Sequence, residues 1–116
     1  MVEKVNDFGV RKTILIGQES YYAALSVKIS GEANAVVKAG EPIVGDLTDR
    51  NTEFTVGTSD AVGINLHEVK LDKNGKGNAT CVFRGVVDAK KLEASVAANV
   101  KTANIAGIDL VEGSAI

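Results

Sequence analysis

Residues 71–87 read LDKNGKGNATCVFRGVV, and this stretch decides the fold class. Asn74-Gly75 separates two runs of strand-forming residues and supplies the positive φ angles that tight β-hairpins require. The return strand, residues 79–87, alternates between two faces, with Cys81 and Phe83 on one and Val82 on the other. The sequence therefore predicts a β-hairpin within a mainly β domain.

The alternation continues on the N-terminal side of the hairpin. Residues 22–30 alternate apolar with small or polar side chains, which predicts a half-buried strand that ends at Gly31. Further strands are expected at residues 35–37, 52–56, 61–71 and 108–112, with a turn at Gly40 and Pro42. In the run 61–71, Ile64 and Leu66 are expected on one face, with Asn65 and His67 on the opposite face.

One segment is predicted to be helical. Asp88 is expected to cap a helix over residues 89–98, with Leu92 and Val96 on one face at the i, i+4 spacing. Asn99 is expected to close this helix.

The first 20 residues differ from the rest, because they mix charges and glycines with one short apolar patch, residues 13–16. An extended arm is the natural interpretation of such a segment. The predicted organisation is therefore an arm, residues 1–20, followed by a β-rich domain, residues 21–116.

Composition excludes several classes of function. A chain of 116 residues is long enough for one domain, and a net charge of −2 without a basic cluster argues against binding to nucleic acid. No apolar run approaches the roughly 20 residues that a membrane span needs.

Cys81 is the only cysteine, so no disulfide can form within the chain. Trp is absent, so aliphatic side chains must build most of the core, and assembly with partners would supply further burial.

No catalytic, cofactor or metal site is expected. His67 is the only histidine, and Cys81 is interpreted as a buried thiol rather than as a nucleophile paired with His67. Asp72 begins a stretch that faintly resembles a calcium loop, but its glycine comes at the fourth position and Phe83 stands at the twelfth. We therefore expect a protein that is not an enzyme.

Three segments taken in order resemble the head decoration proteins of lambda-like tailed bacteriophages. These are residues 39–46 (AGEPIVGD), residues 60–64 (DAVGI) and residues 79–87 (ATCVFRGVV), and their order and spacing agree over about residues 35–110. The resemblance implies a small β-clip or β-tulip-like domain that assembles as a homotrimer on the outer surface of the expanded phage head. It implies the major capsid protein as partner and synthesis in the cytoplasm of the bacterial host.

In that family an N-terminal arm pairs with the major capsid protein and locks the shell. The apolar patch Thr13, Ile14, Leu15 and Ile16 matches that arm in role, and these four residues are the predicted capsid-binding residues. The chain departs from the lambda member in having no tryptophan and a different arm.

Two other interpretations remain open. A structural β module of a phage tail or fibre base would use the same framework of strands. Residues 37–46 also resemble the glycine-aspartate rhythm of biotinyl and lipoyl carrier domains, in which a modified lysine occupies a hairpin tip. Lys73 stands beside Asn74-Gly75 and lacks the neighbours that frame such a lysine.

Overall fold

The structure is a computed structural model that describes residues 14–15, 22–49 and 51–111. Its strands are β1 (Ala23–Ser30), β2 (Val36–Val37), β3 (Pro42–Val44), β4 (Glu53–Val56), β5 (Gly63–Asn65), β6 (Val69–Lys70), β7 (Lys76–Asp88) and β8 (Ile108–Val111). A 3-10 turn, Ala89–Lys91, and helix α2, Ala94–Ala103, lie between β7 and β8. The prediction of a small, mainly β domain with one helix is confirmed.

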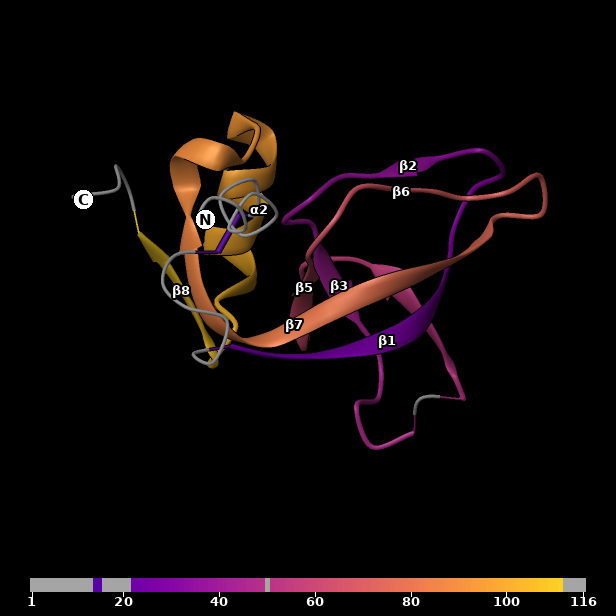
Figure 1. Ribbon diagram of the computed structural model, residues 1–116, viewed down its shortest axis with the longest axis horizontal. Helices are drawn as coiled ribbons and strands as arrows, with labels where there is room; N and C mark the ends of the chain where they lie inside the picture. The colour runs from indigo at the N-terminus through magenta and orange to yellow at the C-terminus, as the bar shows by residue number, and fades with distance from the viewer. Residues whose placement is uncertain (1–13, 16–21, 50, 112–116) are drawn as a thin grey trace, which may run out of the picture.

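Five strands pair in a ring. The order β1-β4-β3-β5-β7 is closed by a long antiparallel pairing between β7 and β1, which run side by side in Figure 1. The pair β2–β6 forms a separate two-stranded ribbon at the end of the molecule away from helix α2. A closed ring leaves few unpaired backbone groups, so short strands can form a stable barrel.

The barrel has an aliphatic interior with one central aromatic ring. Phe54 is fully buried there. The other buried members of this core are Val27, Ile29, Val37, Ile43, Leu71, Ala79 and Cys81. On β1 the buried residues Val27 and Ile29 alternate with exposed Ser26 and Lys28, so the predicted half-buried strand is confirmed.

Strand β7 separates this core from a second one. Cys81 faces the barrel interior, whereas Val82 belongs to the second core, and both side chains are fully buried. The second core also takes in the buried face of α2 through Val96 and Val100. The predicted alternation along β7 is confirmed for Cys81 and Val82, where neither face of the strand meets solvent. It is interrupted at Phe83, because the β1–β7 register shifts between Val82 and Arg84.

The predicted long strand over residues 61–71 is wrong. It is interrupted after Asn65, and its two pieces pair with different neighbours: β5 with β3 and β7, and β6 with β2. Asn65, expected on the polar face, is fully buried. The prediction failed because both faces of β5 are covered, which an alternating pattern does not reveal.

The hairpin turn forms where it was predicted, but Gly75 alone supplies its positive φ. Gly75 has a φ of 76°, and Asn74 is not among the described residues with positive φ. Asp72 closes the turn: its carbonyl accepts from Gly75 N at 2.9 Å, and its carboxylate accepts from Asn74 N and Lys76 N at 2.8 and 3.0 Å. A side chain at position 75 would collide with Gly31, since a Cβ there would lie 2.1 Å from Gly31 O.

The helix begins and ends later than predicted. Asp88 caps only the 3-10 turn, accepting from Lys90 N at 3.0 Å, and α2 starts after an extended Leu92. Leu92 is buried against Gly40, where an added Cβ would lie 2.5 Å from Leu92 Cδ2. Insertion of this side chain into the core breaks the helix in two. Asn104, with a φ of 49°, ends α2 in place of Asn99.

Gly63 on β5 provides a test of the contact between β5 and β7. A methyl group there would lie 2.5 Å from Val82 O and 2.6 Å from Cys81 Sγ. We expect Gly63→Ala to lower the free energy of unfolding by about 1–3 kcal/mol, because the backbone of β7 must shift. Urea unfolding measures this change.

Gly57→Ala is the matched control. Its added methyl would meet only Val44 Cγ2, at 3.3 Å, so a change within about 0.5 kcal/mol is expected. Equal losses in the two variants would show that β5 and β7 do not approach each other this closely.

Candidate functional site

Two of the four predicted capsid-binding residues lie within the described structure. Ile14 and Leu15 are 4% and 9% exposed and belong to the second core. Leu15 forms a bridge with Val87, and Asp88 N donates to Ile14 O at 2.8 Å. These two residues of the predicted arm are therefore held by the domain. Thr13 and Ile16 lie outside the described residues, as do residues 1–12 and 17–20 of the predicted arm.

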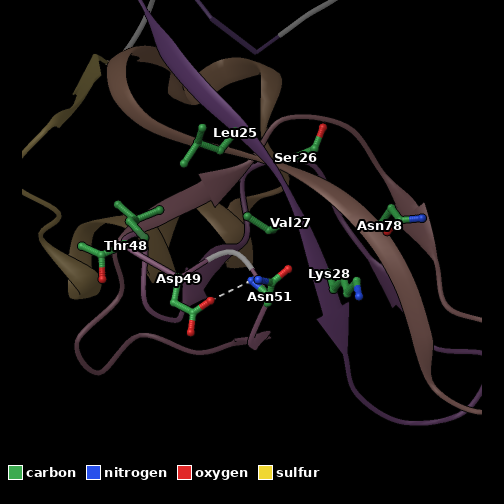
Figure 2. A pocket seen from close by; sticks show the side chains of 9 residues that line it. Leu25, Ser26, Val27, Lys28, Thr48, Asp49, Asn51 and Asn78 are labelled. Atoms are coloured by element: carbon green, nitrogen blue, oxygen red, sulfur yellow. Dashed lines mark hydrogen bonds between the residues drawn. The ribbon is translucent and has the colours of Figure 1, made fainter.

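An open groove of about 850 Å3 lies between β1 and the loop that precedes β4 (Figure 2). Its lining residues are Leu25, Ser26, Val27, Lys28, Leu47, Thr48, Asp49, Asn51 and Asn78. Consecutive residues of β1, which point to opposite faces of the strand, line the same groove. Such a lining means that the groove runs along the edge of β1.

The edge of β1 is open because two strands diverge there. Along one side, β1 pairs with β7 over its whole length, Ala23–Ser30. Along the other side it pairs with β4 only through Lys28 and Ile29. The chain before β4 bends away, so no described strand pairs with the part of this edge from Ala24 to Val27.

The hydrogen-bond pattern shows which backbone groups face the opening. Gly31 N donates to Gly75 O at 2.9 Å, which continues the β1–β7 ladder by one residue. In an antiparallel ladder, alternate residues direct both backbone groups to the same neighbour. The N–H and C=O groups of Ser26, which lines the groove, therefore point away from β7.

The loop before β4 forms the wall of the groove opposite β1, and hydrogen bonds within this loop hold its shape. Asp46 Oδ1 accepts from Thr48 N at 2.9 Å and from Thr48 Oγ1 at 2.6 Å. Asp49 Oδ1 accepts from Asn51 N at 3.1 Å, and Asp49 O accepts from Thr52 Oγ1 at 2.8 Å (Figure 2). The hydroxyl and N–H of Thr48 lower the pKa of the Asp46 carboxyl by stabilising its charged form. These turns fix the shape of the wall.

A second hollow, of about 380 Å3, adjoins the first and shares Lys28 and Asn78 with it. Within this hollow Lys76 Nζ lies 2.5 Å from Glu53 Oε2. The hydrogen bond from Lys76 lowers the pKa of Glu53, and the charge of Lys28 contributes least to this shift. Lys28 is exposed at the junction of the two hollows and forms no ion pair within the described part of the chain.

The residues considered for catalysis do not form a site. Cys81 is fully buried in the barrel, which confirms its interpretation as a buried thiol, and His67 is exposed. Burial raises the pKa of the Cys81 thiol to about 11. In residues 14–15, 22–49 and 51–111, no group of three or more His, Cys, Asp and Glu side chains could hold a metal ion. Across the same residues, no helix has the length and apolar character to cross a membrane.

The sequence pattern did not indicate that Asn65 is a buried residue that holds neighbouring segments of the backbone together. Its Nδ2 donates to Val37 O at 3.2 Å and to Lys38 O at 3.1 Å, and its backbone carbonyl accepts from Gly40 N at 2.6 Å. Asn65 Oδ1 is buried without a partner among the described residues. The side chain thus ties the turn after β2 to β5. In the sequence, Asn65 is an amide within an apolar run, and this pattern is also typical of an exposed strand edge.

No protein-family model matches the sequence, and no curated protein matches it.

The buried thiol predicts an alkaline loss of stability. The ordinary pKa of the group is 9.0 and its folded value is about 11. As the pH rises from 9 to 11, the unfolded thiol ionises first, so stability falls by roughly 2–3 kcal/mol across this window. Urea unfolding between pH 8 and 11 measures the loss, with Cys81→Ala as the variant that lacks this contribution. Parallel curves for the two proteins would contradict the raised pKa.

The start of the arm is also testable. Because the side chain of Ile14 is buried, Ile14→Ala should lower the free energy of unfolding by about 2–5 kcal/mol. Val36→Ala is the control, since Val36 is 45% exposed and a surface substitution changes stability by about 0.5 kcal/mol or less. Unchanged stability in the Ile14 variant would show that this segment does not belong to the core.

Proposed function

We propose that the protein is a capsid decoration protein of a tailed phage. In this proposal it binds the outer surface of the expanded head as a homotrimer, contacts the major capsid protein, stabilises the shell and has no catalytic activity. The observation that carries the proposal is the arrangement of the three segments that resemble the decoration family.

These three segments contribute neighbouring strands. Residues 39–46 contain β3, residues 60–64 enter β5, and residues 79–87 lie in β7. The registers join them directly, with Pro42 opposite Ile64 and Ile64 opposite Val82. The resemblance thus concerns one packed unit rather than scattered small residues.

The glycines of these segments have packing reasons. A Cβ at Gly45 would lie 2.1 Å from Phe54 Cδ2, and one at Gly40 would meet Leu92. Gly63 meets the backbone of β7 in the same way. A pattern of small residues imposed by close contacts is more informative about a shared fold than a pattern of small residues in loops. This supports the transfer of the resemblance to the whole domain.

Exposed apolar side chains are available for contacts between the subunits of a trimer. Val36 on β2, Val56 on β4 and Val111 on β8 are exposed by 45%, 41% and 37%. They lie on three different strands, and contact between unlike surfaces closes a ring when copies are related by a three-fold axis. An arm on each of the three subunits would then add avidity through effective concentration.

The proposal is tested by co-sedimentation with expanded phage heads that lack the protein. We expect saturable binding at about three copies per three-fold position, and a higher temperature for release of DNA from the decorated heads. Unexpanded heads are the control. Binding to tails without binding to heads would replace this proposal with the tail-module interpretation.

The contribution of the arm to head binding is tested with a separate truncation. Because Ile14 and Leu15 belong to the core, removal of residues 1–16 would remove core side chains together with the arm. A truncation that ends at Lys12 keeps both side chains and isolates the effect of the arm on head binding.

A further inference from the structure

The groove beside β1 offers backbone hydrogen bonds to an additional strand. The part of the edge that pairs with no described strand, Ala24 to Val27, spans about 13 Å at the rise of an extended chain. Within this length the N–H and C=O groups of Ser26 point away from β7, and Ser26 lines the groove. An extended segment placed there would continue the line of β4 along β1 and would pair with both backbone groups of Ser26.

The side chains around this edge fit alternate residues of such a segment. Leu25 and Leu47 are half-buried and pack against the barrel core, so they provide an apolar contact on the inner side. Ser26 and Lys28 are exposed on the outer side. A strand with an inward apolar residue and outward polar neighbours matches both surfaces.

The charge of Lys28 indicates which side chain the incoming segment should carry. Lys28 lines the groove, lies opposite Glu53 at the start of β4 and makes no ion pair within the described residues. The neighbouring cation, Lys76, is already paired with Glu53. An acidic side chain on the incoming segment would complement Lys28 without competing for an existing pair.

We infer that this groove binds an extended segment of the major capsid protein, which adds as a strand to the open edge of β1 and places an acidic residue opposite Lys28. This inference rests on the proposed function and gives the domain, in addition to its arm, a contact with the shell. In the arm contact this chain provides the added strand, whereas in the groove its domain accepts a strand from the partner.

A second copy of the chain fits this edge less well. The loop with Thr48, Asp49 and Asn51 forms a wall on the side from which another sheet would have to approach (Figure 2). A capsid segment with an acidic residue is therefore the occupant that Lys28, which makes no ion pair within the described residues, favours.

Proline at position 26 tests the strand addition. Ser26→Pro removes an N–H that points away from β7, so the β1–β7 ladder keeps its bonds while the edge loses a donor and gains a bulky ring. We expect the variant to bind expanded heads at least tenfold more weakly than the wild type. Ser26→Ala, which keeps the N–H, should bind at least fivefold more tightly than Ser26→Pro. Urea unfolding of each variant checks the fold.

Lys28→Glu keeps the inference testable if the proline variant does not fold. It should weaken head binding at least fivefold, whereas Lys73→Glu makes the same change of charge at the exposed tip of the hairpin and should bind as the wild type does. Hydrogen exchange gives a direct measurement: the amide of Ser26 should become protected when the wild type binds heads.

The outcomes separate the two proposals. If the wild type binds heads while Ser26→Pro and Lys28→Glu bind equally well, the groove inference is wrong and the proposed function stands. If the wild type does not bind heads, both are wrong. If Ser26→Pro changes the oligomeric state of the free protein in sedimentation velocity, the edge belongs to a second copy and the inference is overturned.

Discussion

Strand β7 is the constraint on which the rest of the structure depends. Through residues 76–84 it pairs with β1 on one edge, and within this stretch Cys81 and Val82 pair with β5 on the other. Past Arg84 the strand continues away from the barrel, to pair with β8 and to meet Leu15. At Cys81 and Val82 its two faces lie in different cores. Where the strand is paired along both edges and buried on both faces, its neighbours must adopt one register, because any slip would expose apolar side chains and break two ladders.

Closure of the barrel around β7 has a consequence for the opposite side. Strand β4 has four residues and β1 has eight, and β1 pairs with β4 only through Lys28 and Ile29. The remaining edge of β1 is left beside a loop whose turns are fixed by Asp46 and Asp49. Open edges invite pairing with another chain. An exposed edge in a rigid groove is therefore a feature that a binding protein can use.

The same packing explains how a chain with few aromatic residues forms two cores. Phe54 fills the barrel, and glycines at positions 45 and 63 let neighbouring elements approach it and β7 closely. The cores are otherwise aliphatic, with α2 covering one and the barrel wall enclosing the other. Ile14 and Leu15 complete the second core, so an arm that engages a capsid would pull on residues anchored in the domain. Such an arrangement suits a protein proposed to clamp a shell.

The sequence by itself determined the elements whose signals are local. Alternation predicted β1, the turn at Gly75 required glycine, the run after Gly107 predicted β8, and an apolar strand predicted a buried Cys81. Only the tertiary structure decided the rest: the break after Asn65, the shift of the helix beyond Leu92, the placement of Ile14 and Leu15, and the opening beside β1. These features depend on which distant segments pack together, and hydrophobic periodicity reports which face of a segment is apolar but not which partner covers it.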